Sequence, residues 1–96
     1  AQFDVHRLGS VLVIDCQSSL LDRIDSRFVV PLVPVQDAPK VAQRLNPVFK
    51  IDGEGYVMLT QAASAVRLRE LGPKVASLPE HAFEITGALD VLISGV

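Results

Sequence analysis

The sequence contains no tryptophan and a single cysteine, and aromatic residues make up only 5% of the chain. Cys16 has no partner for a disulfide within the chain, which excludes the disulfide scaffold of small secreted proteins and favours a reducing compartment. A lone cysteine is more often a small buried apolar residue than a reactive thiol, and we expect that role for Cys16.

An excess of charge of one sign is also missing. Eleven acidic and nine basic residues give a net charge of −2 and are spread along the chain without runs. Because phosphate binding needs a concentrated basic surface, we expect no direct nucleic-acid partner.

Long apolar segments are absent as well. The longest, residues 28–35, contains Pro31 and Pro34 and is far shorter than the roughly 20 residues that cross a bilayer. No membrane partner is therefore expected. Residues 2–4, Gln-Phe-Asp, lack the basic and apolar parts of a secretion signal, so we expect a cytoplasmic protein.

What the chain does have is aliphatic surface. Its 96 residues are 49% hydrophobic with a mean hydropathy of +0.35, mostly from Val, Leu, Ile and Ala. A chain of this length is expected to form one domain, residues 1–96, and cannot bury so much aliphatic surface in one small core. The surplus predicts a homodimer.

The first half of the chain predicts strands. Phe3 and Val5 alternate with polar residues, the turn residues Gly9 and Ser10 follow, and residues 11–14 are aliphatic, which is typical of a hairpin. Residues 18–26 are predicted to form an ordered loop.

A third strand is predicted to begin at Phe28. Pro31 and Pro34 lack backbone donors, so this strand is expected at a sheet edge or broken by a bulge. Further along, Asp37 could cap a helical turn over residues 38–41. The sequence then predicts strands over 48–51, 56–60 and 66–69, with a glycine-containing hairpin turn at 52–55.

The last segment predicts a helix. Ser77 and Glu80 have the spacing of a capping box, and Pro79 is tolerated in a first turn. Gly87, inside this helix, is either a loosely constrained surface position or a point where another backbone comes close. The expected apolar face comprises Ile85, Ala88, Leu89, Leu92, Ile93 and Val96.

Residues that could carry out catalysis do not converge. His6 and His81 lack a second ligand at metal-binding spacing, and the acidic residues stand singly. Arg67 and Arg69 share one face of a predicted strand and could bind an anion, although a solvated face is the simpler interpretation. We therefore expect no catalytic residue, no metal and no cofactor, and hence a protein-binding role.

The order and spacing of several motifs resemble the CcdB family of toxins. The motifs are Gln2-Phe3-x-Val5, Val13-x-Asp15-x-Gln17-Ser18 with Leu20-Leu21-Asp22, Val30-Pro31-Leu32, Leu45-x-Pro47-Val48, Ile51, Met58-x-Thr60, and a terminal helix ending in Gly95-Val96. The resemblance extends over essentially the whole chain.

The resemblance implies a mainly β fold with a C-terminal α-helix, an SH3-like barrel of the CcdB/MazF toxin type, assembled as a homodimer. It implies a toxin that binds the dimerisation region of the DNA gyrase A subunit, traps the enzyme on cleaved DNA, and is neutralised by a cognate CcdA-like antitoxin. Carried over by position, the gyrase-binding residues are Leu20, Leu21, Asp90, Ile93, Ser94, Gly95 and Val96.

The chain departs from the family pattern at its end. Ser94 stands where the family's gyrase poisons usually have tryptophan, and Asp90 where they tend to have an amide. Because tryptophan is a typical interface anchor, the target stays open between gyrase and another protein. Two alternatives also stay open: a ribonuclease toxin of the same fold, with arginines 27, 67 and 69 as candidates, and a non-toxic relative retained for antitoxin binding or repression.

Overall fold

The predicted N-terminal hairpin is present. In the computed structural model, which describes residues 1–95, β1 (Asp4–Leu8) and β2 (Val11–Asp15) pair antiparallel with Val5 opposite Ile14. The two-residue turn between them contains Gly9 at a φ of 62°, a conformation that glycine adopts without a steric penalty.

The third strand, β3 (Ser26–Pro34), is central in the sheet, so the expectation of an edge strand or a bulge was wrong. β2 pairs with it in continuous register on one side. On its other side β6 (Ser64–Arg67) pairs with the first half and β5 (Glu54–Met58) with the last residues.

Pro31 is accommodated because it lies where the neighbouring strand changes. Its carbonyl accepts a hydrogen bond from the Leu59 N–H at 2.9 Å, so its backbone faces the side of β5 and β6. On that side the pairing with β6 ends at Val29 and the pairing with β5 begins at Leu32. Pro31 therefore lies between the residues that pair with β6 and those that pair with β5, where its lack of an N–H donor breaks no hydrogen bond between strands.

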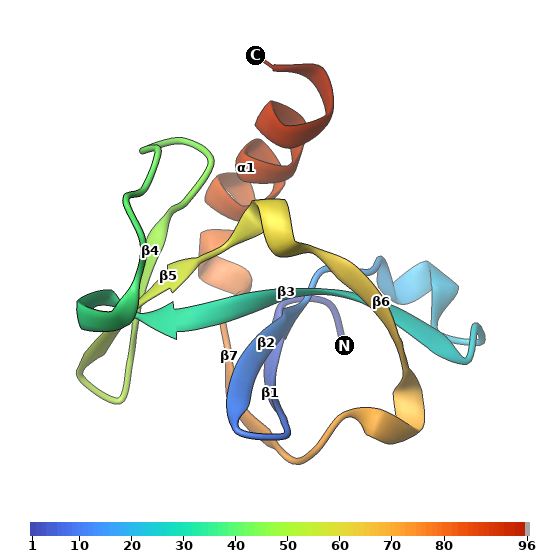
Figure 1. The fold of residues 1–96 in the computed structure, drawn as a ribbon. Helices are drawn as coiled ribbons and strands as arrows, with labels where there is room; N and C mark the ends of the chain where they lie inside the picture. The colour runs from blue at the N-terminus through green and yellow to red at the C-terminus, as the bar shows by residue number, and fades with distance from the viewer. Residues whose placement is uncertain (96) are drawn as a thin grey trace.

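The second predicted hairpin is also present. β4 (Val48–Ile51) pairs with β5 across Asp52 and Gly53, whose φ angles of 52° and 81° fit a two-residue turn. β7 (Lys74–Ser77) adds to the free side of β1. The sheet, in the order β4-β5-β3-β2-β1-β7 with β6 also on β3, curls into a half-barrel, which confirms the predicted fold (Figure 1).

Several local predictions were wrong. Residues 38–41 form no helical turn, and a 3-10 turn lies just before them at Val35–Asp37. The strand expected over 66–69 ends at Arg67 and continues as a 3-10 turn, Leu68–Glu70. β7 was not predicted, because its four residues alternate too briefly to stand out from a loop.

The C-terminal helix α1 (Ala82–Ser94) begins later than its predicted cap. Ser77 belongs to β7, where its hydroxyl donates to Asp4 Oδ1 at 2.8 Å, so the capping box with Glu80 does not form. A 3-10 turn, Pro79–His81, connects β7 to the helix instead. The pairing of β7 with β1 removes Ser77 from the helix terminus.

The core fills the concave side of the half-barrel with aliphatic side chains, and α1 covers it with Ile85 and Ala88. Leu92 and Ile93, expected on the same apolar face, are 43% and 82% exposed, because the helix extends beyond the sheet (Figure 1). The buried cluster comprises Phe3, Val5, Leu12, Ile14, Cys16, Val30, Leu32, Phe49, Ile51, Met58, Leu78, Ile85 and Ala88.

Burial raises the pKa of the Cys16 thiol to about 12, with a smaller effect from Asp15, as expected for an inert buried cysteine.

The buried carboxylate of Asp4 on β1 contacts Ser77 and Lys74 on β7. These contacts predict that the free energy of unfolding falls in acid. Burial by itself raises the pKa of Asp4, but hydrogen bonds from the Ala1 ammonium and the Ser77 hydroxyl bring it below 3.8. A carboxylate with a lowered folded-state pKa stabilises the fold above its unfolded pKa and loses that contribution as the pH falls. Asp4→Asn should therefore lower the free energy of unfolding by about 1 kcal/mol at pH 7, and by progressively less below pH 3.8. Urea titrations between pH 7 and pH 2 measure this, and a difference that stays constant over that range would contradict it.

Candidate functional site

Two large aliphatic side chains, one on a loop and one on the helix, stand almost fully in solvent. Leu20 is 93% exposed and Ile93 is 82% exposed. Isolated exposed leucines are common on protein surfaces, whereas contiguous exposed apolar patches mark interaction sites. Both residues are among those that the sequence assigned to a protein-binding surface.

Leu20 and Leu21 lie in a short 3-10 turn, Ser19–Leu21, that follows β2. The Ser18 hydroxyl caps this turn by accepting a hydrogen bond from the Leu20 N–H at 3.2 Å. Every residue from 19 to 25 is exposed, so the loop presents Leu20 and the half-exposed Leu21 without burying a side chain of its own.

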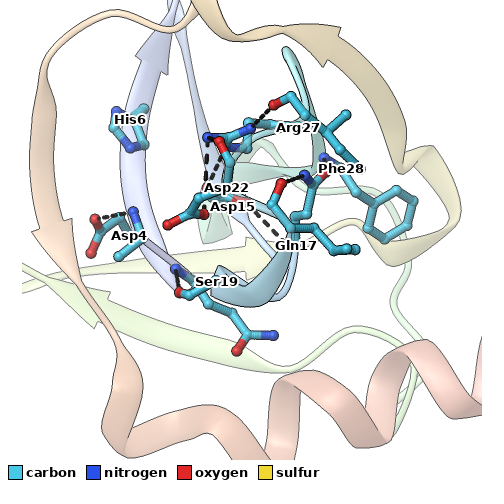
Figure 2. A network of polar contacts seen from close by, with 12 residues as sticks. Asp4, His6, Asp15, Gln17, Ser19, Asp22, Arg27 and Phe28 are labelled. Atoms are coloured by element: carbon cyan, nitrogen blue, oxygen red, sulfur yellow. Dashed lines mark hydrogen bonds and ion pairs between the residues drawn. The ribbon is translucent and has the colours of Figure 1, made fainter.

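Polar side chains from the ends of β2 and β3 hold this loop in place, as Figure 2 shows. The Gln17 amide donates to the Leu21 carbonyl at 3.2 Å and accepts from the Phe28 N–H at 3.0 Å. The Arg27 guanidinium donates to loop carbonyls, including that of Asp22 at 3.1 Å, and lies 3.7 Å from Asp15 Oδ2. The loop is thus an ordered segment, as the sequence predicted.

The second group of assigned residues lies on the last turns of α1. Asp90, Ile93, Ser94 and Gly95 are all exposed. Gly95 has a φ of 74° and its N–H donates to the Val91 carbonyl at 2.8 Å, which ends the helix in a left-handed cap. The Ser94 hydroxyl donates back to the Asp90 carbonyl at 2.7 Å. Val96, also assigned to this surface, lies outside the described residues.

The structure does not bring the two groups together within one chain. Figure 1 shows the light-blue turn with Leu20 and Leu21 at one side of the molecule and the end of α1 projecting well away from it. The two groups would form one surface only if a partner bridged them or if a second copy of the chain brought them together.

A groove beside α1 was not expected from the sequence. It has a volume of about 430 Å³ and includes Phe83, which is 90% exposed. Apart from the neighbouring residues and the nearby backbone of the helix itself, no atom of residues 1–95 lies within 4 Å of a Cβ added at Gly87, so no other described segment approaches this glycine. The groove is lined by Gln43, Arg44, Pro47, Val48, Phe83, Glu84 and Gly87. Phe83 lies off the predicted apolar face, so helical periodicity gave no signal for it.

The remaining candidates for chemistry are dispersed. His6 Nδ1 lies 3.1 Å from the Gly72 carbonyl, whereas His81 contacts Glu84 at 2.9 Å and the ring of Phe49. Within residues 1–95 no group of three or more His, Cys, Asp or Glu side chains could hold a metal ion. Arg27, one of three arginines considered for a ribonuclease site, is buried and engaged with backbone carbonyls.

Comparison with known protein families finds one family whose model matches this chain. The family described as "CcdB protein" matches residues 2–95, nearly the whole chain. The chain belongs to the CcdB family. It is therefore in general terms a toxin of a toxin–antitoxin system, and the CcdB family in general has an antitoxin and DNA gyrase as partners.

The assigned positions of this CcdB family member can now be compared with its structure. Leu20, Leu21, Asp90, Ile93, Ser94 and Gly95 are all accessible to a partner, as a binding surface requires. In the part of the chain that the structure describes, no helix has the length and apolar character needed to cross a membrane.

The exposed leucine and isoleucine should contribute little to folding. Leu20→Ser and Ile93→Ser are expected to change the free energy of unfolding by less than about 0.5 kcal/mol, because surface substitutions away from special features are nearly neutral. Ile85→Ala, in the core beneath α1, should cost about 2–5 kcal/mol. Urea unfolding of the three variants measures the contrast, and a large loss in either serine variant would show that these side chains serve the fold.

Proposed function

We propose that this CcdB family toxin binds the dimerisation region of the DNA gyrase A subunit, traps gyrase on cleaved DNA, and performs no catalysis itself. The observation that carries the proposal is the exposure of Leu20 and Ile93 on ordered elements, at positions where the family resemblance assigns partner contacts. Exposed aliphatic side chains lose water on binding, which is the main favourable contribution at most interfaces. A cognate CcdA-like antitoxin would compete for or distort this surface in the cytoplasm.

A homodimer would double this surface and would explain the apolar exposure of a single chain. The described residues leave many large apolar side chains at least one-third exposed on several elements, among them Val11, Ile24, Val48 and Phe83. Such an amount of apolar surface on a small chain is typical of a subunit interface.

Sedimentation equilibrium at micromolar concentration should therefore give about twice the chain mass of 10.4 kDa. The apparent mass should fall only on strong dilution, because a tight dimer dissociates by mass action. A mass of 10.4 kDa throughout the micromolar range would contradict the dimer.

The end of α1 is the sharper test of gyrase binding. Deleting residues 94–96 should abolish growth inhibition while the melting temperature changes little, because an exposed last turn contributes few core contacts. Ser94→Trp should strengthen binding to a gyrase A fragment by about tenfold or more, since it restores an aromatic anchor. Titration of the fragment and a gyrase assay scored for cleaved DNA measure both effects.

Val75→Thr, at a 37% exposed position on β7, is the matched control and should leave binding unchanged. If the truncated protein remains toxic, the binding surface does not include the end of the helix. If the full chain binds its antitoxin but never traps gyrase, the non-toxic alternative replaces this proposal.

A further inference from the structure

The loop from Ser18 to Asp25 has no apolar anchor in the core. Residues 19–25 are all exposed, and the backbone–backbone hydrogen bonds next to Leu20 are local ones, such as Leu21 N–H to the Ser18 carbonyl at 2.9 Å. More distant segments contribute two single hydrogen bonds, from the Gln2 N–H to Ser19 Oγ at 3.3 Å and from the Leu68 N–H to the Asp25 carbonyl at 2.9 Å. A short 3-10 turn with no buried side chain is marginal by itself. Something outside the loop must therefore fix where Leu20 and Leu21 lie.

Arg27 supplies the first of these contacts. Its guanidinium donates from Nη1 to the carbonyls of Ile24 and Ser26, the latter at 2.9 Å, and from Nη2 to the carbonyl of Asp22 at 3.1 Å. The residue is only 7% exposed, so water does not compete strongly for these donors. A planar group with several donors in a fixed fork is suited to holding several carbonyls at once.

Asp15 balances the buried charge. Its Oδ2 lies 3.7 Å from Arg27 Nε and its Oδ1 accepts from the Gln17 N–H at 3.0 Å, while Asp22 Oδ1 lies 3.9 Å from Arg27 Nη2. Buried ion pairs rarely add stability over apolar residues of similar size, because both charges lose their hydration. The fork is directed at the loop carbonyls rather than at Asp15, which indicates that its main effect is on the loop.

Gln17 supplies the second contact. Its side-chain amide accepts a hydrogen bond from the Phe28 N–H in β3, as Figure 2 shows, and donates one to the Leu21 carbonyl in the loop. The loop is thereby held at both of its ends, by Gln17 near the end of β2 and by Arg27 near the start of β3. Because the carbonyl of Leu21 itself is held, the Leu20–Leu21 pair cannot move without breaking one of these contacts.

We infer that Arg27 and Gln17 are positioning residues that hold the Leu20–Leu21 pair in a preformed arrangement for its protein partner. The inference rests on the proposed function, in which that pair contacts gyrase A. An ordered loop binds more tightly than a mobile one, because the entropy of ordering it is not lost on association. Neither residue needs to touch the partner for this effect.

Arg27→Lys tests the inference while keeping a positive charge near Asp15. A lysine ammonium cannot reach three carbonyls in the fork geometry, so hydrogen exchange of the Leu21, Asp22 and Ile24 amides should become about tenfold faster. Amides of the β1–β2 hairpin should exchange as before. The dissociation constant for a gyrase A dimerisation fragment should rise about tenfold.

A double-variant cycle separates positioning from a general loss of stability. In a Leu20→Ser, Leu21→Ser background the leucines are gone, so Arg27→Lys should no longer weaken binding. An affinity loss of the same size in that background would overturn the inference. Unchanged exchange at Leu21, Asp22 and Ile24 would overturn it as well.

Gln17→Ala is the second variant, for the case that Arg27→Lys fails to fold. It should accelerate exchange at Leu21, whereas Gln36→Ala, an exposed glutamine on a 3-10 turn away from this loop, should not. If the unchanged protein does not bind the gyrase fragment, the proposed function fails, but the exchange measurements still decide whether Arg27 and Gln17 hold the loop.

Discussion

The pairing of β3 on both of its sides is the constraint on which the rest of this fold depends. β2 binds one side of this strand, whereas β6 and β5 share the other in succession. The strand thus has two different neighbours along one side, and the twisted sheet curls into a half-barrel (Figure 1). The concave side then needs a cover, which Ile85 and Ala88 of α1 provide. The change of neighbour also creates the position in which Pro31 is tolerated in the middle of a sheet.

Two polar networks connect neighbouring segments of this protein. Asp4 connects the Ser77 hydroxyl and the Lys74 ammonium of β7 to β1, and Arg27 connects β3 to the loop that follows β2. Within the described residues, every buried side-chain nitrogen and oxygen has a hydrogen-bond partner. Since a buried polar group without a partner is costly, these networks specify one arrangement of the segments that they connect.

The surfaces available for binding follow from the same architecture. The end of α1 extends beyond the sheet, so Ile93 is exposed although it belongs to an amphipathic helix. The 18–25 loop is held by hydrogen bonds from the side chains of Gln17 and Arg27 to its backbone, so its own leucines remain in solvent. At the helix tip the Ser94 hydroxyl binds the preceding turn, and Ile93 is the most exposed large apolar residue there among the described residues.

The sequence by itself determined the elements that depend on local pattern. The Gly9 and Asp52-Gly53 turns, the strands beside them and the amphipathic C-terminal helix could be predicted, because turn geometry and hydrophobic period are local properties. Only the tertiary structure decided the place of β3, the use of Ser77 by Asp4 instead of by the helix, the exposure of Phe83 and the separation of the two surface groups. The contacts of Arg27 with the loop also came from the structure alone, since its hydrogen-bond acceptors there are backbone carbonyls, which leave no trace in the side-chain pattern. These features depend on which segments meet in space, and long-range pairing and burial are not encoded in any one short window of sequence.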